Sequence, residues 1–119
     1  MKKLIIALSL VLSQASFAAI SNSSLEVRHA SLVESAIADN CGSFMKLVEV
    51  NSKKEIIKVD QGITDAKFVT TLEGVQKFDQ FFDKYVITVE SEYYDSYDHD
   101  VKDWGIYRVS SVKCTFVNN

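Results

Sequence analysis

The segment that decides the fold is SSLEVRHASLVESAIAD, which runs from Ser23 to Asp39. Its apolar residues recur three and four positions apart, which predicts a helix with one face on a core: Leu25, His29, Leu32, Val33, Ala36 and Ile37. Ser23 to Glu26 matches a capping box, in which the Glu26 side chain accepts a hydrogen bond from the backbone amide of the cap residue. Asn40 and Gly42 favour a left-handed stop. We therefore predict one helix from about Ser24 to Asp39, with Cys41 at its C-terminal end.

After Gly42 the hydrophobic period changes to two, which is typical of β-strands. The predicted strands are Phe44–Val50, Glu55–Val59, Ala66–Leu72, Lys84–Tyr94 and Trp104–Val117, with a polar turn at Asn51–Lys54. Glu73-Gly74 predicts a β-bulge, and residues 75–82 fit a helical turn and a bent strand equally. In the last strand the alternation predicts one inward face, interrupted by Arg108 and Ser110. The residues of this face are Trp104, Ile106, Val112, Cys114 and Phe116.

A helix followed by strands predicts an α+β fold, with one N-terminal helix packed on a curved four- to five-stranded antiparallel sheet. This layout resembles cystatin-like folds in architecture alone. The glutamine–glycine inhibitory loop of cystatins has no counterpart, since Gln61-Gly62 and Gln76 lack its valine pattern. The likeness therefore implies a fold and no activity.

The N-terminus has the pattern of a secretory signal peptide. Lys2 and Lys3 precede an apolar run that is too short to span a bilayer, and small residues at Ser16 and Ala18 suit a signal peptidase. We expect residues 1–18 to be cleaved after Ala18, leaving residues 19–119 as a single domain without a membrane anchor. The expected location is the bacterial periplasm or the medium.

Charge limits the classes of partner. The whole chain has a net charge of −3, and removal of residues 1–18 leaves 11 basic and 16 acidic residues, a net charge of −5. Nucleic acids and anionic lipids need a concentrated basic surface, and the basic residues here are scattered. The sequence therefore predicts no nucleic-acid partner.

Cys41 and Cys114 are the two cysteines of the chain. An even number of cysteines in an exported protein predicts a disulfide, because the compartment is oxidising. A metal or redox pair is disfavoured, since there is no CxxC spacing and no histidine nearby in the sequence. We expect a Cys41–Cys114 bond that joins the helix to the last strand.

Residues 90–105 form the densest polar cluster, with six acids, three tyrosines, a histidine and a tryptophan. One hypothesis is a Ca²⁺ site, because hard cations prefer several carboxylate oxygens; its ligands would be Asp95, Asp98, Asp100 and Asp103. The spacing departs from that of an EF-hand, and a solvated acidic turn explains the acids as well. The second hypothesis is a protein-binding hairpin, in which Tyr94, Tyr97, Trp104 and Asp98 recognise a partner, and the flanking carboxylates favour a cationic one. Ordinary strand packing of these aromatic residues is the simpler alternative.

The sequence predicts no catalytic residues. His29 lies on the apolar face of the helix, where a buried and hydrogen-bonded histidine is the common case, and acids surround His99. There is no glycine-rich phosphate loop and no serine at a nucleophile elbow. The preferred interpretation is therefore a binding protein without a cofactor. The alternative is a small periplasmic enzyme, with a carboxylate or histidine site on the concave face of the sheet.

Overall fold

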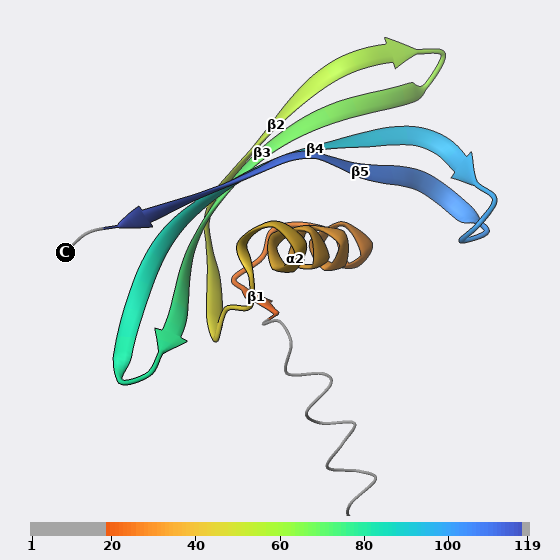
Figure 1. Ribbon diagram of the computed structural model, residues 1–119. Helices are drawn as coiled ribbons and strands as arrows, with labels where there is room; N and C mark the ends of the chain where they lie inside the picture. The colour runs from red at the N-terminus through yellow and green to blue at the C-terminus, as the bar shows by residue number, and fades with distance from the viewer. Residues whose placement is uncertain (1–18, 118–119) are drawn as a thin grey trace, which may run out of the picture.

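The computed structural model describes residues 19–117, in which one helix lies against the inner side of a curled sheet (Figure 1). The elements in chain order are β1 (Ile20–Ser21), α2 (Val27–Cys41), β2 (Lys46–Asp60), β3 (Ile63–Phe78), β4 (Phe81–Asp98) and β5 (Asp103–Val117). The predicted signal peptide and its cleavage after Ala18 lie outside the described residues. Within residues 19–117 no helix has the length and apolar content needed to cross a membrane. The predicted α+β class is confirmed in this coarse form.

The sheet has five strands in the order β1-β2-β3-β4-β5. β2 to β5 pair antiparallel, but β1 pairs parallel with β2, Ile20 lying opposite Leu47. The sheet is therefore mixed, and the prediction of a purely antiparallel sheet is wrong at this edge. A two-residue strand is too short to have a period. It is held by tertiary contacts, since the Ile20 amide donates to Glu34 Oε2 of the helix over 2.9 Å.

The predicted helix is confirmed, but its start is not. α2 begins at Val27, and Glu26, the N-cap residue, makes no side-chain capping bond. The expected capping box is absent, since the Ser23 hydroxyl accepts from the Leu25 amide over 3.2 Å. The Ser24 hydroxyl donates to Glu49 of β2 over 2.6 Å. The C-terminal end is as predicted: Gly42 has φ +86°, and its amide donates to the Ala38 carbonyl over 3.1 Å.

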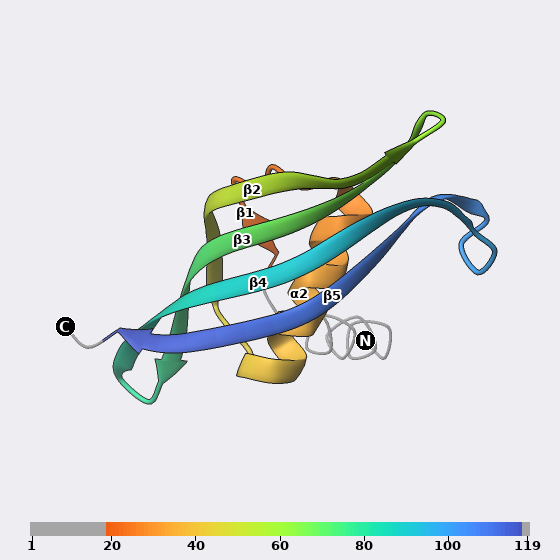
Figure 2. The same cartoon turned by 90° about the horizontal axis from the view of Figure 1, so that it is seen from above.

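The core lies between α2 and the inner face of the sheet, where the helix crosses the strands (Figure 2). His29, Val33 and Ile37 are the buried helix residues, whereas Leu32 is 36% exposed. The buried apolar cluster consists of Val33, Ile37, Phe44, Leu47, Leu72, Ile87 and Val89. Burial of such side chains contributes about 1.5–3 kcal/mol each, so this cluster is the main source of stability.

The predicted turn at Asn51–Lys54 is wrong. β2 continues through these residues to Asp60, and the chain reverses at Gln61-Gly62. This half of β2 is mostly exposed, and Figure 1 shows it extending with β3 beyond the helix, so apolar alternation is not required there. Pairing with β3 keeps it extended, and Ser52 Oγ bonds Thr70 Oγ1 over 3.0 Å.

Curvature comes from register shifts rather than from Gly74. The shifts lie at Val50 and Ile57 in β2, near Ser110 in β5, and between Tyr94 and Tyr97 in β4. Such bulges bend and twist a sheet, which lets it curl around the helix.

Gly74 keeps regular pairing, so the predicted bulge is wrong. Its glycine is needed for close approach, since a Cβ there would lie 2.7 Å from the Phe44 ring.

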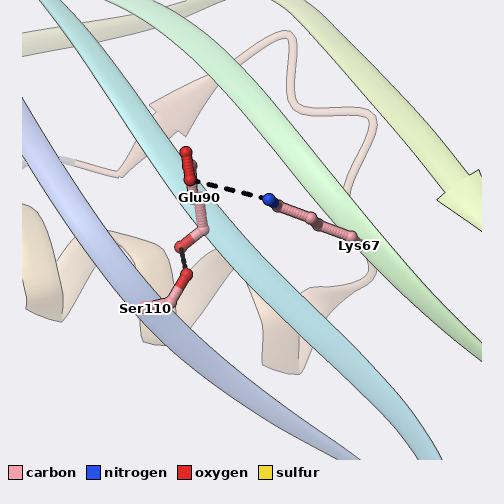
Figure 3. Close-up of polar contacts among 3 residues, drawn as sticks. All are labelled: Lys67, Glu90 and Ser110. Atoms are coloured by element: carbon pink, nitrogen blue, oxygen red, sulfur yellow. Dashed lines mark hydrogen bonds and ion pairs between the residues drawn. The ribbon is translucent and has the colours of Figure 1, made fainter. Parts of the chain in front are cut away.

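The shift near Ser110 also changes which β5 residues face the helix. Glu90 lies opposite Ser111 and Ser91 opposite Val109, so Ser110 is the extra residue. Its hydroxyl donates to the Glu90 carbonyl over 3.1 Å, while Lys67 Nζ lies 3.8 Å from Glu90 Oε2 (Figure 3). Because one extra residue inverts the alternation, Val109 packs against the core. The prediction that Trp104 and Ile106 share a face with Cys114 is therefore wrong.

Residues 75–82 form a tight β3–β4 hairpin, with Asp79 at φ +59° in its turn. Three phenylalanines at this hairpin are largely exposed: Phe78, Phe81 and Phe82. Figure 1 places this hairpin at the opposite end of the sheet from the β4–β5 turn. The molecule thus displays aromatic residues at both ends.

Candidate functional site

The predicted disulfide is present. Cys41, the last residue of α2, is bonded to Cys114 of β5, with 6.1 Å between the two Cα atoms. Both residues border the buried apolar cluster. The bond therefore fastens the C-terminal end of the helix to the edge strand of the sheet, as the sequence predicted.

The β4–β5 hairpin carries an exposed aromatic surface, which we call the tip patch and define as Tyr97, Val101 and Trp104. These residues are 39%, 52% and 61% exposed, respectively. The Tyr97 and Trp104 rings are in edge contact, with their centroids 5.9 Å apart. Two of the residues of the hypothetical binding hairpin, Tyr97 and Trp104, therefore lie side by side.

The backbone beneath the tip patch is held in place. Asp98 Oδ1 accepts bonds from the amides of Asp100 and Val101, and Lys102 closes the turn onto the Asp98 carbonyl over 2.7 Å. On the other side, Arg28 Nη2 of α2 donates to the Trp104 carbonyl over 2.8 Å. A preformed surface loses less conformational entropy on binding, which favours recognition.

Tyr94 is separate from the tip patch. It is half-buried and pairs with Ile106, and the Arg108 guanidinium lies 6.0 Å from its ring centroid. Burial, together with the neighbouring Glu92, raises the pKa of Tyr94. Tyr97 contacts the Trp104 ring, whereas the ring of Tyr94 lies beside the Arg108 guanidinium.

The four aspartates proposed as calcium ligands do not converge. Asp95 accepts from the Thr64 amide, Asp98 caps the turn, and Asp103 accepts from the Trp104 amide over 2.8 Å. Within residues 19–117 no three acidic, histidine or cysteine side chains are grouped to hold a metal ion. The acids of this hairpin therefore contribute backbone caps and negative charge.

A cavity of about 440 Å³ that the sequence did not predict lies between the N-terminal turn of α2 and the sheet. We call it the helix pocket, and its lining residues are Ser24, Leu25, Glu26, His29, Lys54, Phe68, Tyr93 and Tyr107. These residues come from the segment before α2, from α2 itself and from β2, β3, β4 and β5. No local motif contains them, because only the curled sheet brings them together.

His29 forms the buried polar wall of the helix pocket. It is 1% exposed, and its Nε2 lies 2.7 Å from the hydroxyl of Ser91, which is itself fully buried. The imidazole stacks on Tyr107 and meets the edge of Phe68, each at a centroid distance of 4.7 Å. Burial lowers the pKa of His29, so the ring is neutral near pH 7. The expectation of a buried, hydrogen-bonded histidine is confirmed.

Glu26 and Tyr107 are coupled at the mouth of the helix pocket. Burial and the adjacent Glu26 carboxylate raise the pKa of Tyr107 to about 12. Burial alone would raise the pKa of Glu26, but hydrogen bonds from the Arg28 amide and the Tyr107 hydroxyl outweigh it, and the pKa is lowered. The pocket therefore carries an ionised carboxylate beside a neutral phenol near pH 7.

Comparison with known proteins found no matching family model, no matching curated protein and no matching solved structure. The likeness to cystatins is therefore not confirmed.

The lowered pKa of His29 predicts a stability that depends on pH. In the unfolded state the histidine is protonated near its ordinary pKa of 6.5, whereas in the folded state His29 is protonated only at lower pH. The unfolded state then binds more protons, so the free energy of unfolding should fall as pH drops through 6.5 and be fully retained above it. Urea unfolding at a series of pH values from about 7.5 to 5.5 measures this dependence. His29→Gln should be less stable overall but should lose less stability over that interval. An equal loss in both proteins would assign the dependence to other groups.

Proposed function

We propose that this protein is an exported, disulfide-stabilised binding protein that recognises a cationic protein partner through the tip patch. The observation that carries the proposal is the pair of exposed aromatic side chains, Tyr97 and Trp104, in contact on a turn whose backbone is held from both sides. Tyrosine and tryptophan are the residues that contribute most to protein interfaces, because they supply large contact areas with few rotatable bonds. In this proposal the protein acts by binding rather than by catalysis.

Charge supports a cationic partner. Residues 90–103 contain six acids and one base, Lys102, and the protein without residues 1–18 has a net charge of −5. A negative surface increases the association rate with a positive partner, and salt weakens this attraction. Export is supported by the disulfide, which requires an oxidising compartment, and by the N-terminal sequence pattern.

The proposal predicts which side chains are needed for partner capture. Immobilised protein, purified without residues 1–18, should retain basic proteins from the extracellular and periplasmic fractions of the source cells, and less of them at high salt. Tyr97→Ala with Trp104→Ala should weaken retention about 30-fold, the effect of losing an interface hot spot. Mass spectrometry and competition binding measure the loss.

The β3–β4 hairpin provides the matched control. Phe81→Ala with Phe82→Ala also removes two exposed aromatic side chains, but from the other end of the sheet, and should leave retention unchanged. If the phenylalanine variant loses the partner and the tip variant keeps it, the binding surface lies at the opposite hairpin and the proposal is wrong.

A further inference from the structure

The helix pocket has the composition of a site for an organic cation. Aromatic side chains from three strands, Phe68, Tyr93 and Tyr107, line it, and the ionised Glu26 carboxylate lies at its mouth. Aromatic faces attract ammonium groups through their quadrupoles, and several rings grouped around a cation recognise such groups in proteins. A nearby carboxylate adds Coulomb attraction. A cavity of about 440 Å³ has room for an alkyl chain that ends in a charged nitrogen.

The chain itself already places an ammonium group in this pocket. Lys54 reaches it from β2, and its Nζ lies 5.9 Å from the centroid of the Phe68 ring. Lys54 is exposed, so its flexible side chain can leave without disturbing the core. The lysine thus shows that the pocket fits an ammonium, and it would compete with a ligand of the same chemistry.

The charges around the pocket floor are negative on balance. Burial is the main influence on His29, but the two charged groups that act on it, Glu26 and Glu49, both favour its protonated form. Tyr93 is close to another carboxylate, since its hydroxyl lies 3.4 Å from Asp95 Oδ1. The opposing charges are Lys54 and Arg28. Arg28 lies 5.4 Å from the centroid of the Tyr107 ring and donates to the backbone carbonyls of Trp104 and Gly105.

The helix pocket borders the base of the β4–β5 hairpin, because Tyr93 of β4 and Tyr107 of β5 line it. Tyr93 and Tyr107 face each other across β4 and β5, and Gly105 lies against the Tyr93 ring, where a Cβ would be only 2.7 Å away. We propose that the helix pocket binds an alkylammonium group, supplied by a lysine side chain of the cationic partner that the tip patch recognises. This assignment of the partner rests on the proposed function, whereas the affinity of the pocket for ammonium can be tested alone.

The test uses n-butylammonium as the probe and butyrate as an anion of similar length. Titration followed by the NMR signals of the tyrosine rings should show n-butylammonium binding with a dissociation constant on the order of 10 mM, as suits so small a ligand. Butyrate should bind more weakly. Glu26→Gln should weaken n-butylammonium binding roughly two- to fivefold, because the pocket loses its carboxylate.

The Lys54→Met variant tests whether Lys54 competes with the ligand for the pocket. If Lys54 competes with the ligand, its removal should strengthen n-butylammonium binding roughly two- to fivefold. Lys53→Met is the matched control, because it removes the same charge from the neighbouring residue, whose side chain points to the other face of β2, and it should change the affinity less. Weaker binding of n-butylammonium in Lys54→Met, or preferred binding of butyrate, would overturn the inference, as would binding of neither probe.

The outcomes separate this inference from the proposed function. If n-butylammonium binds but the Tyr97→Ala, Trp104→Ala variant retains the partner as well as wild type, the ammonium site is supported and the proposed role of the tip patch is refuted. If partner retention depends on Tyr97 and Trp104 but n-butylammonium does not bind, only the proposed ammonium site is refuted.

Discussion

Replacing Cys41 and Cys114 together with alanine should lower the free energy of unfolding by about 4 kcal/mol. The bond joins residues separated by 73 positions, and in the chain-entropy model a loop of that length restricts the unfolded state by this amount. The folded state of a small domain is favoured by only about 5–15 kcal/mol, so the variant should be close to unfolding at physiological temperature.

The C-terminal end of α2 should be the part most affected, because the disulfide holds it to β5. Urea unfolding followed by circular dichroism measures the loss, and the wild-type protein with its disulfide reduced is the matched comparison. Reduced wild type and the double alanine variant should agree closely. A loss below about 1 kcal/mol in both would mean that the packing of Val33 and Ile37 alone holds the helix on the sheet.

Gly74→Val should destabilise the fold by about 2–3 kcal/mol, although valine is ordinarily better than glycine in a strand. Gly74 is buried, and a Cβ there would lie 2.7 Å from the Phe44 ring and 3.0 Å from the Ile87 side chain. Phe44 is itself 4% exposed and packed in the core, so its ring has little room to move. Overpacking should therefore outweigh the gain in strand propensity.

A double-variant cycle isolates the contact. Phe44→Leu alone should cost about 1–1.5 kcal/mol, and combined with Gly74→Val it should cost clearly less than the sum of the two single changes, because the smaller side chain makes room for valine. Glu73→Val on the exposed neighbour controls for strand propensity and should be nearly neutral. Strict additivity would show that Phe44 does not cause the penalty at Gly74.

Periodicity predicted the apolar helix face and several strands, because both depend on local patterns. It was wrong at Asn51–Lys54, since a strand that extends past the helix needs no apolar alternation and is kept by pairing with β3. It was also wrong for Trp104 and Ile106, because the extra residue at Ser110 inverts the alternation. A bulge adds one residue without a distinctive sequence, so the period-two pattern alone does not locate it.

The candidate sites differ in how far the sequence could predict them. Tyr97 and Trp104 are few residues apart in one hairpin, so their contact followed from proximity in sequence. The helix pocket joins Glu26, Lys54 and Tyr107, which are far apart in the chain and carry no shared motif. His29 was expected to be buried, but its partners Ser91 and Tyr107 were not predictable, because they depend on the register of β4 and β5.

By itself the sequence determined the helix, its end at Gly42, the pairing of Cys41 with Cys114 and the negative charge of the β4–β5 hairpin. These follow from local spacing, residue chemistry and an even number of cysteines. Only the tertiary structure decided that Ser24 bonds Glu49 of β2, that Gly74 admits the Phe44 ring, and that an aromatic pocket opens beside His29. The physical reason is that these contacts depend on strand register and sheet curvature, which are set by the packing of distant residues together.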